Sequence, residues 1–69
     1  MAPLGKNLRL LRKSRKWTQQ TLAAKLKVSR VSIARIELGM TKADFAFVCK
    51  AADLFGVPTD DLRKANFHA

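Results

Sequence analysis

Residues 19–38 constrain the fold most, because they predict two short helices joined by a tight turn. The segment reads QQTLAAKLKVSRVSIARIEL. Its large apolar residues recur at helical spacing, one pair on each helix: Leu22, Leu26, Ile33 and Ile36. Each helix therefore has one narrow apolar stripe. The small side chain of Ala23 lets the two helix axes approach closely.

The second helix of this segment leaves a short basic face pointing outward. Its outward residues include Arg30, Val31, Ser32 and Arg35. The major groove of duplex DNA admits an α-helix and displays the base edges, so this face suits DNA. Arginine matches guanine O6 and N7, valine can meet a thymine methyl group, and serine can contact a base or a phosphate. We predict that these four residues read bases, with phosphate binding as the alternative for each arginine.

The chain resembles the phage repressor and Cro-type helix-turn-helix family, also described as XRE-like transcription regulators. The matching sequences are LGKNLRLLRKSRKWTQQTLAAKLKVSRVSIARIELG and, more loosely, CKAADLFGVPTDDL, which together span roughly residues 4–62. The resemblance implies an all-α, compact five-helix, lambda-repressor-like DNA-binding domain. An unrelated helical bundle is the alternative.

Length and composition predict a single domain over residues 1–69, with a tail at 65–69. Sixty-nine residues lie near the lower limit for a core without metal or disulfide. The single cysteine excludes an internal disulfide, and one Cys with one His cannot form a zinc site. We expect no cofactor. The N-terminus has no signal-peptide core, and no stretch is apolar enough to span a membrane, so we expect a cytoplasmic protein.

Charge is distributed unevenly along the chain. Residues 1–42 carry a formal charge of +10, whereas residues 43–69 carry −1. A basic half joined to a nearly neutral half predicts one face for a polyanion and another face for a different contact. We therefore expect double-stranded DNA as the main partner.

Capping residues set the expected helix boundaries. Thr18 and Ser29 are expected to cap the two helices of the 19–38 segment. A T-x-x-D pattern at Thr41 and Asp44 predicts the start of a fourth helix as a variant capping box. Thr59 is expected to cap a last short helix. The expected core face of the fourth helix comprises Phe45, Val48, Ala51, Ala52 and Phe55.

Further phosphate contacts are expected around the two helices. Gln19 lies at a helix N-terminus, where free amides favour an anion, and its family counterpart contacts phosphate and supports the second helix of the segment. Lys42 follows the second helix, in a loop that grips the DNA backbone in similar repressors. Lys27 occupies a turn position where the family usually has glycine. It either adds a charge near DNA or is a tolerated left-handed residue without a role. The remaining candidates are Gln20, Arg9, Lys13, Lys16 and Lys25.

Glu37 is the only acid among residues 1–42. Similar repressors pair an acid here with an arginine of the first helix, which corresponds to Arg12. A buried carboxylate would be costly without such a partner. We predict an ion pair between Arg12 and Glu37, the alternative being an exposed acid.

Residue inventory argues against an enzyme. The only histidine is His68 in the tail, Cys49 has no neighbouring base, and no glycine-rich phosphate loop is present. The favoured function is sequence-specific binding of double-stranded DNA by a dimeric transcription regulator on a two-fold symmetric operator. The alternative is a DNA-binding antitoxin whose main role is to neutralise a toxin protein.

Assembly is expected to use apolar residues that lie off the core. Phe47 and Leu54 are seven residues apart on the fourth helix, and Pro58 and Phe67 follow in sequence. We predict a homodimer through these four residues. A larger apolar patch reaching Leu10 would instead indicate a second protein, such as a toxin or a polymerase.

Overall fold

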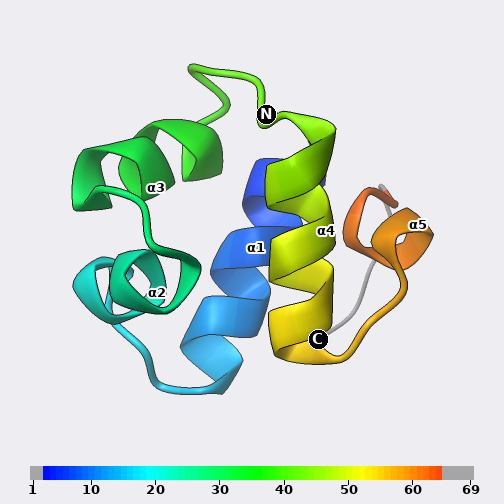
Figure 1. Cartoon of the computed structure of the whole chain (residues 1–69), viewed down its shortest axis with the longest axis horizontal. Helices are drawn as coiled ribbons and strands as arrows, with labels where there is room; N and C mark the ends of the chain where they lie inside the picture. The colour runs from blue at the N-terminus through cyan, green and yellow to red at the C-terminus, as the bar shows by residue number, and fades with distance from the viewer. Residues whose placement is uncertain (1–2, 65–69) are drawn as a thin grey trace.

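The computed structural model describes residues 3–64, which form five α-helices and no strand (Figure 1). The helices are α1 (Pro3–Ser14), α2 (Gln19–Leu26), α3 (Arg30–Glu37), α4 (Phe45–Phe55) and α5 (Thr59–Leu62). The all-α, five-helix prediction is confirmed. The expected tail, with Phe67 and His68, lies outside the described residues. None of these five helices is both long and apolar enough to cross a membrane.

Helix α1 lies at the centre of the arrangement. It packs against α3 on one side and α5 on the other, while α4 contacts α2 and α5 (Figure 1). Helices α2 and α3 pack on each other at one end of the molecule. This arrangement leaves the outer side of α3 uncovered within residues 3–64.

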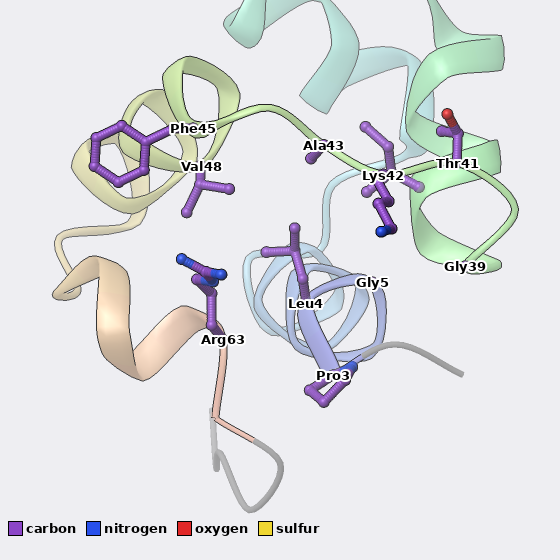
Figure 2. Close-up of a pocket in the computed structure, with 11 residues that line it drawn as sticks. Pro3, Leu4, Gly5, Gly39, Thr41, Lys42, Ala43, Phe45, Val48 and Arg63 are labelled. Carbon is purple, nitrogen blue, oxygen red and sulfur yellow. The ribbon is translucent and has the colours of Figure 1, made fainter.

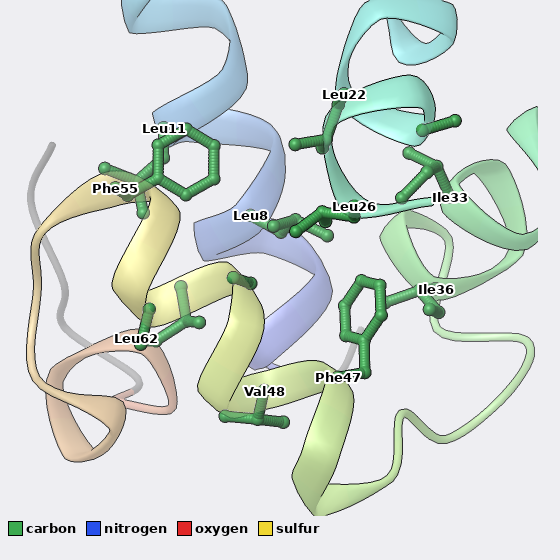
Figure 3. Packing of buried hydrophobic residues seen from close by; sticks show 13 residues of the cluster. Leu8, Leu11, Leu22, Leu26, Ile33, Ile36, Phe47, Val48, Phe55 and Leu62 are labelled. Carbon is green, nitrogen blue, oxygen red and sulfur yellow. The ribbon is translucent and has the colours of Figure 1, made fainter. Parts of the chain in front are cut away.

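The core takes side chains from every helix (Figure 3). Leu8, Leu22, Ile33 and Leu62 have no exposed surface, and they come from α1, α2, α3 and α5 respectively. Helix α4 contributes Phe47, Val48, Ala51, Ala52 and Phe55. Full burial of one such large aliphatic side chain stabilises the fold by roughly 1.5–3 kcal/mol. Helix α3 joins this core through Ile33 and Ile36.

Two predicted caps are confirmed, and two others are wrong. The Thr18 hydroxyl accepts a 3.1 Å hydrogen bond from the N–H of Thr21, and Ser29 accepts one of 3.1 Å from Ser32. Asp44 is itself the N-cap of α4, where it accepts from the N–H of Phe47 at 2.8 Å. The predicted capping box that begins at Thr41 is therefore absent. Thr59 is the first residue of α5, and Pro58 is its N-cap without a side-chain hydrogen bond.

Each of the first four helices is followed by a residue in the left-handed backbone region. These residues are Lys16 (φ 59°), Lys27 (φ 59°), Gly39 (φ 73°) and Gly56 (φ 69°). After each, the next N–H returns to a carbonyl five residues back, as when the N–H of Val28 donates to Ala23 at 3.0 Å. Glycine adopts this conformation freely, whereas lysine is strained in it. The backbone at Lys27 is the one that the family's usual glycine requires.

The expected core face of α4 is wrong at its N-terminal end. Phe45 is 67% exposed, whereas Phe47 is only 9% exposed and belongs to the core. Because the Asp44 cap starts the helix at Phe45, residues 47, 48, 51, 52 and 55 form its inward arc. Phe45 then lies at the edge of that arc. Phe45, which was expected in the core, is exposed, and Phe47, which was expected outside it, is buried.

Candidate nucleic-acid interface

Helix α3 presents two different faces. Ile33 and Ile36 are buried, whereas Arg30, Val31 and Arg35 are exposed, with 47% of Val31 accessible to solvent. Val31 and Arg35 are four residues apart and therefore neighbours on one side of the helix. Arg30 occupies the first helical position, where a side chain can reach beyond the helix end. This exposed face is a compact set of two cations and one apolar group.

Ser32 lies at the edge of the same face. It is half-buried, and its hydroxyl oxygen lies 3.0 Å from that of Ser29. The two hydroxyls share one hydrogen bond at the start of α3, in addition to the Ser29 cap. The structure therefore places all four predicted base-reading residues on the outer half of α3, with Ser32 the least accessible.

A buried ion pair connects α1 to the C-terminal end of α3. Arg12 donates from Nε to Glu37 Oε2 at 2.8 Å and from Nη2 to Oε1 at 3.0 Å. The residues are 8% and 3% exposed, and the remaining Arg12 amine donates to the carbonyl of Trp17 at 2.9 Å. A carboxylate is unfavourable at the negative end of a helix dipole, so the two parallel hydrogen bonds compensate both that position and its burial.

Gln19 faces this ion pair as well as the exposed face of α3. Its Nε2 donates to Glu37 Oε1 at 3.2 Å, and its Oε1 accepts from Arg30 Nη1 at 3.5 Å. A contiguous chain of hydrogen bonds therefore runs from Arg12 through Glu37 and Gln19 to Arg30. The family resemblance suggested Gln19 as a phosphate contact that also supports α3, but it did not suggest the hydrogen bond to Glu37. One feature of the sequence could have indicated this link: Gln19 is a polar residue in the first turn of α2, the helix that crosses α3.

Gly5 places α1 unusually close to α3, which the sequence analysis also missed. A Cβ added at Gly5 would overlap the carbonyl oxygen of Ile36 and lie 2.9 Å from that of Glu37. Only glycine therefore permits this backbone approach. A glycine inside an otherwise helical pattern was the available signal, because it costs about 1 kcal/mol relative to alanine and needs a packing reason.

Other predicted phosphate-binding residues lie on α1, on α2 and in the loops on either side of α3. Gln20, Lys27, Lys42, Arg9 and Lys13 are all exposed. Arg9 and Lys13 continue the four-residue row that begins at Gly5, so they flank the side of α1 that packs on α3. Lys27 lies in the turn between α2 and α3, and Lys42 lies in the loop between α3 and α4.

Asn7 is a buried polar residue whose role the sequence did not suggest. It is 1% exposed and donates from Nδ2 to the carbonyls of Leu62 at 2.8 Å and Lys64 at 2.7 Å. These two bonds attach the end of α5 to α1. Lys64 in turn forms an exposed ion pair of 2.7 Å with Asp61, and this hydrogen-bonded carboxylate raises the pKa of Lys64.

The residues proposed for a dimer are distributed differently from the expectation. Phe47 was expected to lie off the core, but its burial removes it from any surface contact. Leu54 is half-buried against the core, and Pro58 is exposed at the start of α5. Phe67 lies outside the described residues. Leu10, the marker of a larger patch, is 37% exposed.

Comparison with known proteins agrees with this geometry. A family model described as helix-turn-helix matches residues 8–62. A hypothetical transcription factor, NHTF, from Neisseria has a similar crystal structure, with 27% sequence identity, a TM-score of 0.84 and coverage of 91% of this chain and 72% of that one.

The restriction-modification controller protein C.AhdI from Aeromonas hydrophila shares the fold, with 24% identity, a TM-score of 0.80 and coverage of 88% and 92%. No curated protein sequence matches the chain significantly. Together with the capped α2–α3 pair, the family match shows that the chain belongs to the XRE-type helix-turn-helix family of DNA-binding transcription regulators.

Proposed function

We propose that this protein is a sequence-specific regulator of transcription that binds double-stranded DNA as a homodimer on a two-fold symmetric operator. The observation that carries the proposal is the outer face of α3. It exposes Arg30, Val31 and Arg35, while its opposite face is fixed by the core and by the Arg12–Glu37 pair. A rigid helix with an exposed basic end is the element that enters a major groove in this family.

Electrostatics supports the same proposal. Residues 1–42, which contain α1, α2 and α3, carry a formal charge of +10. Lysine and arginine neutralise phosphates and release the counterions condensed on DNA, which supplies much of the binding free energy. The predicted phosphate contacts at Gln19, Gln20, Lys27, Lys42, Arg9 and Lys13 therefore belong to this proposal.

The size of the molecule favours two copies on each operator. The described residues include one helix proposed to read bases, α3, and their backbone extends 26 Å at most, whereas successive major grooves on one side of DNA lie about 34 Å apart. One copy reads only a few base pairs, too few for specificity in a genome. The dimer surface proposed here is centred on Leu54 and Pro58, and it does not include the buried Phe47. No observation favours the antitoxin alternative.

Selection of bound duplexes from a random pool tests the proposal. We expect an enriched motif with two inverted half-sites whose centres lie about one helical turn apart. A variant carrying both Arg30→Ala and Arg35→Ala is the control, and it should enrich no motif. A single asymmetric motif would contradict the dimer, and enrichment of no motif by the natural chain would contradict sequence-specific binding.

A further inference from the structure

A groove lies between the N-terminal end of α1, the loop joining α3 to α4, and Arg63 after α5 (Figure 2). It encloses about 560 Å³, a volume typical of a ligand-binding cleft. Leu4, Ala43 and Val48 supply apolar surface within it. Its position at the end of α3 separates it from the base-reading residues at the start and middle of that helix.

Two cations line this groove, and among its described lining residues there is no acid. Figure 2 shows the side chains of Lys42 and Arg63 on either side of Leu4. Both cations are exposed, and neither forms an ion pair within residues 3–64. The neighbouring Lys64, in contrast, is paired with Asp61. The groove therefore combines an apolar surface with two cations that are available to carboxylates from another molecule.

The segment beside the groove exposes large apolar side chains. Leu38 and Met40 are 60% and 71% exposed and alternate with the lining residues Gly39 and Thr41. Phe45, which lines the groove itself and follows the capping Asp44, is 67% exposed. Isolated exposed apolar residues are ordinary, but three within eight residues at the edge of a groove mark a surface for protein contact.

Charge decides between the possible occupants. A two-fold contact between copies of this chain through the groove would bring two Lys42 and two Arg63 side chains together without intervening acids, which is repulsive. A DNA phosphate would satisfy the cations but would leave the apolar surface and the exposed Phe45 unused. A peptide with carboxylates on both sides of an apolar residue complements both features.

We propose that this groove binds an acidic segment of another protein that also presents large apolar side chains. Lys42 belongs to the groove and also to the proposed DNA contacts, so the acidic segment and DNA compete for it. The binding of the peptide stands on the groove alone, whereas the competition rests on the proposed function. This competition would release the regulator from DNA when its acidic partner is present.

The test starts with a random dodecapeptide display library selected on the full chain. Counter-selection uses only the support without protein, so that peptides binding anywhere on the chain can be enriched. We expect enriched peptides to contain at least two carboxylates around an apolar residue. Their affinity should fall at least about tenfold in the double variant, because two desolvated charge pairs are lost and reversed. The matched control, Lys6→Glu with Lys50→Glu, makes the same charge change at exposed lysines outside the groove and should retain most of the affinity.

A second variant tests the apolar part of the site without disturbing the core. Phe45 is largely exposed, so Phe45→Ser should leave the far-ultraviolet circular dichroism spectrum unchanged and weaken the selected peptides by about threefold or more. Enriched peptides without carboxylates, or peptides that bind the Lys42→Glu, Arg63→Glu variant as well as the natural chain, would overturn the proposal.

Competition is measured by fluorescence anisotropy with a labelled duplex and a selected peptide. The peptide should displace DNA from the natural chain. Arg63→Ala should abolish that displacement while keeping duplex affinity within about twofold, whereas Lys42→Ala should weaken both ligands. If Arg63→Ala weakens duplex binding as much as Lys42→Ala does and the library yields no peptide, the groove is a phosphate site and the proposal is wrong. Peptide binding by a chain that binds no DNA would support the groove and contradict the proposed function instead.

Discussion

Gln19 and Glu37 are joined by a hydrogen bond of 3.2 Å, although 18 residues separate them in sequence. The same carboxylate oxygen accepts from Arg12. One acid at the end of α3 therefore bonds to the beginning of α2 and to the last turn of α1. This hydrogen bond adds a polar contact to the apolar packing between α2 and α3.

Replacement of Glu37 by glutamine should lower the free energy of unfolding by about 3 kcal/mol, because the Arg12 guanidinium would stay buried without a counter-charge. Urea denaturation measures the change. Asp61→Asn, which breaks the exposed pair with Lys64, is the control and should leave the free energy of unfolding nearly unchanged. In a double-mutant cycle with Arg12→Met, the two changes should be less than additive. Additive losses would show that the two charges act independently.

Arg30→Ala and Arg35→Ala should each weaken binding to the best operator by about 1–3 kcal/mol and relax the preference at particular base pairs. Lys42→Ala should weaken all duplexes nearly equally, because phosphate contacts carry no sequence information. Binding titrations on the selected operator and on a scrambled duplex measure both effects. The assignment fails if the arginine variants keep the natural ratio of specific to nonspecific affinity.

Affinity for duplex DNA should fall steeply with salt. For a dimer we expect a slope of log affinity against log salt on the order of −4 to −9, from roughly −0.9 for each phosphate neutralised. Anisotropy titrations over a series of salt concentrations measure this slope. Lys27→Ala and Lys13→Ala should each make the slope shallower, by about two for a dimer if each lysine contacts one phosphate. A nearly flat response would exclude the basic face as the source of affinity.

Lys27→Gly should stabilise the fold by about 0.5–1 kcal/mol, since glycine removes the left-handed strain at φ 59°. Lys16 has the same φ and should respond in the same way. Lys6→Gly removes the same charge from an exposed position inside α1 and should instead cost about 0.5–1 kcal/mol. Thermal denaturation of the three variants separates backbone strain from charge, and destabilisation by both Lys27→Gly and Lys16→Gly would contradict the argument.

Leu54→Lys should leave the monomer folded, because Leu54 is only partly buried, and should reduce operator binding by disturbing the proposed dimer. Analytical ultracentrifugation and operator titrations measure the two effects. Asp53→Asn, one residue away on an exposed position, makes the same change of +1 in net charge and is the control. Unchanged affinity and cooperativity on a full operator would place the interface elsewhere.

Local signals in the sequence predicted much of the fold. Thr18 and Ser29 act through hydrogen bonds to residues three positions later, so their neighbours in sequence suffice to predict the caps. The helix-turn-helix segment was equally clear because its apolar spacing is local. The contact between Arg12 and Glu37 spans 25 residues, and it was expected only through the family resemblance.

The register of α4 depended on contacts that the sequence does not specify. Apolar residues occur almost all round this helix, so Phe45, Phe47 and Leu54 were each plausible on either side. The position of the capping residue Asp44, which the preceding loop sets, determines which of these side chains face the core. Thr59 differs from its prediction by one residue, which is the ordinary uncertainty of a helix end. Gly5 and Asn7 contact carbonyl groups that are distant in sequence, so neighbouring residues gave little indication of their roles.

The close approach at Gly5 fixes the orientation of α3 without involving the exposed side chains of that helix. The position of α3 is fixed from behind, by the backbone of α1 and by the buried carboxylate at its end. The exposed side chains of α3 take no part in the backbone contact with α1. We therefore expect residues 30, 31 and 35 to tolerate exchange, so that chains with this scaffold can acquire new target sequences by changing those positions while the orientation of the helix stays the same.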